Sequence, residues 1–103
     1  MEQLSICRLH QTGPRHSRDM VVVLQHALLD DLNTRVVAPL VLSSELPHIP
    51  KLRPKVRIDE KDYVVAIDRL AAVPRRSVGE MLGSMLMRRE EMIAAVDFLF
   101  TGV

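Results

Sequence analysis

The side chains that most often carry metal or thiol chemistry are few and scattered in this sequence. Cys7 is the single cysteine, and its apolar, alternating surroundings are typical of a small buried hydrophobe rather than of a reactive thiol. The four histidines share no short motif with the cysteine or with one another; they are His10, His16, His26 and His48. Zinc sites need ligands at short spacings, so we expect no metal site, and a single cysteine leaves no internal disulfide. We also expect no bound cofactor.

Patterns for nucleophilic or phosphate chemistry are also missing. The chain has no G-x-S-x-G motif, and its four glycines form no glycine-rich loop for a phosphate. The adjacent carboxylates Asp30–Asp31 and Glu90–Glu91 are typical of solvated surface, although they leave acid–base chemistry open. Arg75–Arg76 follows Pro74 in an expected loop, where it can meet a phosphate, an acidic partner or solvent alone. No catalytic residue stands out.

Charge and aromatic content argue against two further kinds of site. Lys plus Arg number 14 and Asp plus Glu number 13, so the formal net charge of +1 does not indicate a nucleic-acid binder. Two phenylalanines, one tyrosine and no tryptophan predict an aliphatic core and argue against a site of stacked rings. With 103 residues, of which 48% are hydrophobic, we expect one domain over residues 1–103.

No segment is long enough to cross a membrane. The longest apolar run, Val36–Leu42, is interrupted by Pro39 and falls far short of the roughly 20 residues that a spanning helix needs. The first residues lack the basic start and the unbroken apolar block of a signal peptide. We therefore expect a cytoplasmic protein.

The elements that must position any site are strands in the first half of the chain. Residues 3–6 alternate between polar and apolar, Met20–Leu24 is a short β-branched run, and Arg35–Leu42 is a third expected strand. Pro39 predicts that this third strand lies at an edge or carries a bulge, since proline donates no ladder hydrogen bond. The three prolines of Ser43–Pro54 predict an ordered loop with a single helical turn at most.

A hairpin and one further short strand are expected next. Val56–Asp59 alternates cleanly, and Tyr63–Ile67 follows after a polar loop of three residues. Leu70–Val73 is a candidate strand that Pro74 ends.

The last third of the chain changes to a helical period. One face carries Met92, Ile93, Val96, Leu99 and Phe100, and Met85 and Leu86 extend this face one heptad earlier. Ser84 is a candidate N-cap, and Gly102 lies where helices commonly end. The opposite face carries Glu90, Ala94, Asp97 and Thr101.

Taken in order, these segments resemble the CcdB family, the toxin half of a bacterial toxin–antitoxin pair. The resemblance covers about four-fifths of the chain, and it consists of collinear positions and a shared C-terminal end rather than one sharp motif. Tyr63 stands where the family often has tryptophan. The matching positions are 20–31, Arg35, Val37, Pro39, Leu40, Pro54, Val56, Ile58, Asp68, Ala71, Val73, Pro74, Gly79, Glu80 and 95–103.

The resemblance implies a fold, a function and partners. The fold is α+β and mainly β, a small SH3-like barrel with a C-terminal α-helix. The function is that of a toxin, not itself an enzyme, that binds the A subunit of DNA gyrase and traps the gyrase–cleaved DNA complex. The implied partners are a second copy of the chain and a CcdA-like antitoxin with a disordered tail. The toxin–antitoxin complex, rather than the toxin alone, would contact DNA and repress its own operon.

The resemblance also implies which residues contact gyrase. Thr101 departs from the family, because it replaces a tryptophan whose ring stacks on a gyrase arginine, a contact of roughly 0.5–2 kcal/mol. Asp97 is hypothesised to pair with that arginine instead, as it neighbours Thr101 one helical turn away. Leu28 and Leu29 match an aliphatic pair that lines the same surface, or are plain core. The complete implied set is Leu28, Leu29, Asp97, Phe100, Thr101, Gly102 and Val103.

Two alternatives stay open. The loss of the tryptophan allows a CcdB-like protein that keeps its fold, dimer and antitoxin but no longer poisons gyrase. The other alternative is an endoribonuclease of the MazF kind, which shares the barrel. Its catalytic loop would lie near Gly13–His16, where Arg15 and His16 are present without the spacing of that family.

Overall fold

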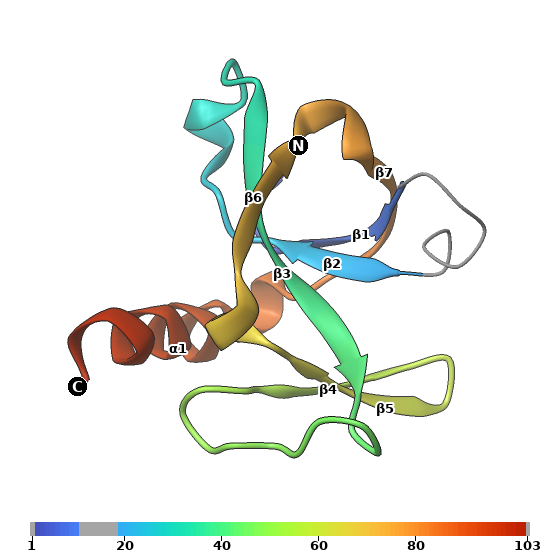
Figure 1. Ribbon diagram of the computed structural model, residues 1–103, viewed down its shortest axis with the longest axis vertical. Coiled ribbons are helices and arrows are strands. Elements are labelled where there is room, and N and C mark those ends of the chain that lie inside the picture. The colour runs from blue at the N-terminus through green and yellow to red at the C-terminus, as the bar shows by residue number, and fades with distance from the viewer. Residues whose placement is uncertain (1, 11–18, 103) are drawn as a thin grey trace.

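The chain folds into a curled antiparallel sheet with one α-helix at its C-terminal end (Figure 1). The computed structural model describes residues 2–10 and 19–102. Within them the strand order is β4-β5-β3-β2-β1-β7, and β6 pairs with β3. The bounds are β1 Ser5–Leu9, β2 Met20–Val23, β3 Thr34–Leu42, β4 Lys55–Ile58, β5 Lys61–Val65, β6 Ala71–Pro74, β7 Val78–Ser84 and α1 Arg89–Thr101.

Strand β3 joins the two halves of the sheet. Along one edge it pairs with β6 through Thr34–Val37 and with β5 through Leu40–Leu42, and its other edge pairs with β2. The expectation of an edge or a bulge at Pro39 is wrong, because Pro39 lies opposite Val21 in this central strand. The carbonyl of Pro39 accepts from the Ala66 amide at 2.9 Å, so the backbone nitrogen of Pro39 also faces the junction of β6 and β5, away from β2. The missing N–H of Pro39 therefore removes no ladder hydrogen bond to β2.

The core is aliphatic, as the composition predicts. Helix α1 buries Met92 and Ala95 against residues of β1, β2, β3 and β5 and against Ile67 of the short 3₁₀ turn η3 (Ile67–Arg69). None of the largest fully buried side chains in the described residues is aromatic. The main cluster consists of Leu4, Ile6, Val22, Ala38, Leu40, Val65, Ile67, Met85, Met92 and Ala95.

The expected hairpin is present, with a tighter turn than the polar loop of the sequence suggests. Strand β5 begins at Lys61, and only Asp59 and Glu60 connect it to β4. Both turn residues have positive φ, 50° and 65°, as a two-residue hairpin turn of the right twist requires. The candidate strand before Pro74 is also confirmed as β6.

The C-terminal helix is shorter than its periodicity predicts. Ser84 ends β7, and its hydroxyl accepts from the Leu86 amide at the start of the 3₁₀ turn η5 (Leu86–Arg88), whereas α1 begins only at Arg89. The end is as expected. Gly102 takes the left-handed conformation at φ 77°, and its amide donates to the Phe98 carbonyl. None of the helices in the described residues is long and apolar enough to span a membrane.

Candidate functional site

Exposed leucines gather on one short turn that connects β2 to β3. The 3₁₀ turn η2 (Ala27–Leu29) buries none of its residues. Leu28 is 85% exposed, Leu29 is 49% exposed, and Leu32 is also exposed. The reading of Leu28 and Leu29 as plain core is therefore wrong. A contiguous patch of exposed apolar side chains often marks an interaction surface, whereas apolar side chains exposed singly are common and need no explanation.

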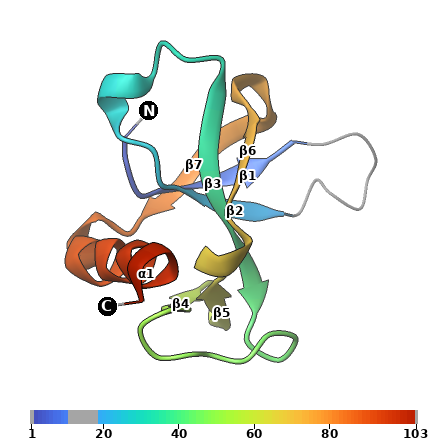
Figure 2. The same cartoon turned by 60° about the vertical axis from the view of Figure 1, so that its left-hand side comes forward.

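A shallow apolar hollow lies between this turn and the C-terminal half of α1. Its volume is about 390 Å³, and its lining includes Leu29 from the turn and Phe100 from the helix. Phe100 is 69% exposed, although its helical phase places it beside the core-facing residues. Figures 1 and 2 show η2 and α1 on the same side of the molecule. The lining residues are Leu24, Gln25, Leu29, Val36, Leu70, Val96 and Phe100.

The apolar strip continues along the helix. A second hollow of about 120 Å³ shares Leu24 and Val96 with the first and reaches Gln3 and Ile93. Together with Leu28, these two hollows and their linings form a surface that we call the helix-end surface. It collects side chains from the segment before β1, the connection after β2, β3, the residue before β6, and α1, which are far apart in the sequence.

The other expected contact residues lie at the end of the same helix. Asp97, Thr101 and Gly102 are exposed, and they lie beside the hollow rather than in it. The Thr101 hydroxyl donates to the Asp97 carbonyl at 2.7 Å, so it caps a backbone group of its own helix and not the carboxylate. The exposed Asp97 carboxylate is available to a partner. Val103 lies outside the described residues.

Two buried polar side chains lie beneath η2, and sequence reasoning does not single them out as functional. Gln25 is 8% exposed and Arg35 is 3% exposed, and both donate hydrogen bonds to carbonyls of the β2–β3 connection. A signal was present, because strand alternation places Gln25 on the same face as Val23 and Arg35 on the same face as Val37, both buried. Polar residues at inward-facing positions are uncommon unless they are hydrogen-bonded.

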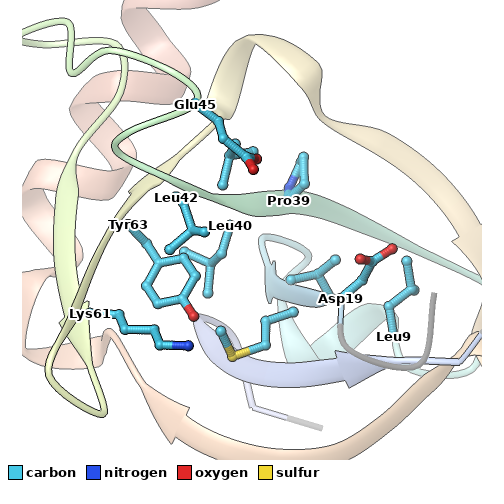
Figure 3. A pocket seen from close by; sticks show the side chains of 11 residues that line it. Leu9, Asp19, Pro39, Leu40, Leu42, Glu45, Lys61 and Tyr63 are labelled. Atoms are coloured by element: carbon cyan, nitrogen blue, oxygen red, sulfur yellow. The ribbon is translucent and has the colours of Figure 1, made fainter. Parts of the chain in front are cut away.

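A separate pocket opens between the two halves of the sheet, lined by none of the residues of the helix-end surface (Figure 3). Its volume is about 480 Å³. Lys61 and Tyr63 enter from β5, and Asp19 enters from the opposite side. Among the described lining residues, two carboxylates outnumber one ammonium group, which disfavours a nucleic-acid backbone. The lining comprises Leu9, Asp19, Met20, Val21, Pro39, Leu40, Val41, Leu42, Glu45, Lys61 and Tyr63.

The remaining candidates for chemistry do not assemble into a site. Cys7 is fully buried, and burial raises the pKa of its thiol, which disfavours the reactive thiolate. The described residues bring no three His, Cys, Asp or Glu side chains together as metal ligands. The His10 ring packs directly on Gly79. Arg15 and His16, which belong to the endoribonuclease alternative, lie outside the described residues.

Comparison with known proteins gives a family and a fold. The family model described as CcdB protein matches residues 5–102. A solved structure of the Mycobacterium tuberculosis toxin MazF-mt6 superimposes with a TM-score of 0.75 at 17% identity, covering 93% of this chain and 95% of that one. No curated protein sequence matches. The expected fold class, a mainly β CcdB/MazF-like barrel with a C-terminal helix, is therefore confirmed.

Proposed function

We propose that this chain, which belongs to the CcdB family and is the toxin of a toxin–antitoxin system, poisons DNA gyrase. In this proposal the helix-end surface binds the A subunit and holds the enzyme on cleaved DNA. The protein acts by binding and performs no chemistry of its own.

One observation supports this surface above all others. Leu28 and Leu29 project from η2 beside the hollow that Phe100 borders, so three expected contact residues present apolar area to one partner. Full burial of a leucine or phenylalanine side chain contributes about 1.5–3 kcal/mol. A few such anchors around a pocket are sufficient for a specific interface.

Thr101 makes the contact different from that implied by the resemblance. Threonine offers no ring to a gyrase arginine, and a two-fold dimer repeats the loss in both copies. The reduction in affinity can reach about a hundredfold, or 2.7 kcal/mol. We propose that Asp97 offsets part of it through an ion pair with that arginine, since its carboxylate is exposed one helical turn away.

The proposal includes a homodimer. Within the described residues β6 pairs only with β3, so its outer edge is open, and Ala71 and Ala72 on it are exposed. Leu70, the residue before β6, lines the hollow. A second copy that docks along this edge would bring two helix-end surfaces together at the two-fold axis.

The other partners follow from the same premise. A CcdA-like antitoxin neutralises the toxin with a tail that folds on binding, and the complex represses its own operon by contacting DNA through the antitoxin. The proposed location is the cytoplasm, where gyrase and DNA are found. No cofactor takes part.

A toxin that has lost gyrase poisoning is the second candidate. Thr101 occupies the position of the family's tryptophan, and its hydroxyl donates to a carbonyl of its own helix. This end of the surface therefore provides fewer contacts for gyrase. Such a protein would keep its antitoxin and its dimer.

Expression without antitoxin separates these readings. The proposal predicts growth arrest in ordinary cells and normal growth in cells that carry a resistant gyrase A subunit. A matched control is Met87→Ser, which removes an almost fully exposed apolar side chain in η5, before the N-terminal end of α1, and should arrest growth as the unaltered protein does.

Two results would contradict gyrase poisoning. Arrest that persists in the resistant cells excludes gyrase as the target, and absence of arrest in both strains favours the non-poisoning candidate. RNA cleavage by the purified protein that Arg15→Ala or His16→Ala abolishes would establish the endoribonuclease instead.

A further inference from the structure

The loop after β2 and the first residue of β3, residues 26–34, have an unusual orientation, and we call this segment the inverted loop. Its leucines at positions 28, 29 and 32 face solvent, and its turn η2 buries no residue. Several of its carbonyl oxygens point inward, toward two buried polar side chains. A loop anchored by the hydrophobic effect would have the reverse arrangement, with leucines inside and carbonyls in water.

The Gln25 amide ties both arms of this loop together. Its nitrogen donates to the Leu29 carbonyl at 3.1 Å and to the Thr34 carbonyl at 3.2 Å, and its oxygen accepts from the Val36 amide at 3.2 Å. The last backbone rung between β2 and β3 is the bond from the Leu24 amide to the Val36 carbonyl. The side chain therefore continues the ladder along β3 for one step beyond its last backbone rung to the β2 side, and it closes the loop at its base.

The Arg35 guanidinium fastens the tip of the same loop. One terminal nitrogen donates to the carbonyls of Leu32 and Thr34 at 2.8 and 3.0 Å, and the other donates to the Asp30 carbonyl at 2.7 Å. Its Nε has no hydrogen bond and lies 3.7 Å from the Asp30 carboxylate. Burying an arginine with an unbonded nitrogen costs desolvation free energy, and apolar residues would fill the same space at a lower cost.

We propose that Gln25 and Arg35 are positioning residues that hold the inverted loop with its leucines outward, ready for the partner. They fix the backbone through its carbonyls, so the leucine side chains stay free for the interface. A loop ordered before binding loses less conformational entropy on association, which increases affinity. The effect on partner binding rests on the proposed function, whereas the effect on the loop does not.

Amide hydrogen exchange in the free protein tests the clamp without any partner. Gln25→Met keeps the length of the side chain and removes its three hydrogen bonds. We expect the amides of Leu29, Asp30 and Leu32, which are bonded within the loop, to exchange at least tenfold faster, while those of the β4–β5 hairpin change little. Arg35→Met should act in the same way; if it fails to fold, Gln25→Met alone decides.

Arg53→Met is the matched control. Arg53 also donates to a loop carbonyl, that of Pro47, and to Asp68, but it fastens a different loop. Its removal should speed exchange at Leu52 and Leu46 and leave residues 28–34 unchanged. Unaltered exchange of residues 28–34 in Gln25→Met, or a uniform acceleration across the whole chain, would overturn the proposal.

A double-mutant cycle tests the link to binding, with an isolated gyrase A fragment as the probe. Gln25→Met should weaken binding about tenfold in the unaltered chain and have no further effect when Leu28→Ser and Leu29→Ser are already present. A purely structural role would give the same tenfold loss in both backgrounds and would contradict a positioning role. If the unaltered protein does not bind the fragment, the proposed function fails, and the exchange experiment still decides the clamp.

Discussion

Two loops of this protein are fastened by arginine, yet they face opposite ways. In the inverted loop Arg35 holds carbonyls inside and the leucines project into solvent. In residues 43–54, the proline loop, Leu46 is buried with Val64 and Ala66, and Arg53 forms a two-bond ion pair with Asp68 near the surface. The proline loop follows the ordinary rule of apolar inside and charge outside. The inverted loop departs from it, and such departures tend to mark binding sites.

The largest expected effect concerns the proline loop. Leu46→Ala removes a buried side chain and leaves a cavity, so we expect the free energy of unfolding to fall by about 2–4 kcal/mol. Urea denaturation measures this loss. Affinity for the gyrase A fragment should not change at temperatures where the variant is folded. A loss of affinity in fully folded Leu46→Ala would mean that both loops serve the partner.

The next effect concerns the inverted loop, where we expect a loss of affinity with little change in stability. Leu28→Ser with Leu29→Ser should leave the free energy of unfolding within about 1 kcal/mol, because both side chains are largely exposed. Affinity for the gyrase A fragment should fall about a hundredfold or more, equivalent to about 2.7 kcal/mol. Calorimetric titration gives the affinity. A strong destabilisation without loss of affinity would reverse the roles assigned to the two loops.

The ion pair of the proline loop gives a smaller effect that depends on pH. The Arg53 guanidinium beside Asp68 holds the pKa of that carboxyl below its usual range. Because this pKa is lower in the folded protein than in the unfolded chain, the pair stabilises the fold fully above about pH 4 and loses its contribution as the pH falls through the folded pKa.

Arg53→Met removes this dependence. We expect it to lower the free energy of unfolding modestly at pH 7, since both partners are partly exposed. Urea denaturation at pH 7 and at about pH 3 should show the difference from the unaltered protein shrinking in acid. An equal difference at both pH values would show that Asp68 is not the partner that matters.

The smallest effect is expected at the helix end. Asp97→Ala should weaken binding to the gyrase A fragment by about tenfold or less, the size of an exposed ion pair. It should raise the free energy of unfolding by a few tenths of a kcal/mol, because an acid near a helix C-terminus is unfavourable. Unchanged poisoning in a gyrase cleavage assay would remove Asp97 from the contact.

Periodicity predicts much of this fold from the sequence. The β4–β5 hairpin, β6 and the end of α1 at Gly102 follow from alternation and from the left-handed preference of glycine. The prediction from Pro39 is wrong, because proline is excluded only where the backbone N–H must donate a ladder hydrogen bond. On the side that the Pro39 nitrogen faces, β3 changes its partner from β6 to β5. The prediction from Ser84 is wrong, because its hydroxyl accepts from the first amide of a 3₁₀ turn and not from an amide of α1.

The candidate surface was predictable only in part. The resemblance supplies Leu28, Leu29 and Phe100, and the structure places Leu29 and Phe100 in the lining of one hollow and Leu28 on the turn that carries Leu29. Two further lining residues of that hollow, Val36 and Leu70, come from segments that no local pattern connects. Gln25 and Arg35 escape a search for apolar faces and for catalytic groups, because their role depends on carbonyls that only the folded loop aligns.

DNA cleavage by purified gyrase is the most direct test of the central claim, that the helix-end surface poisons this enzyme. The unaltered protein should accumulate linear DNA, Leu28→Ser with Leu29→Ser should accumulate at most about a hundredth as much at the same limiting concentration, and Met87→Ser should match the unaltered protein. No linear DNA with the unaltered protein, or undiminished cleavage by the leucine variant, would contradict the account.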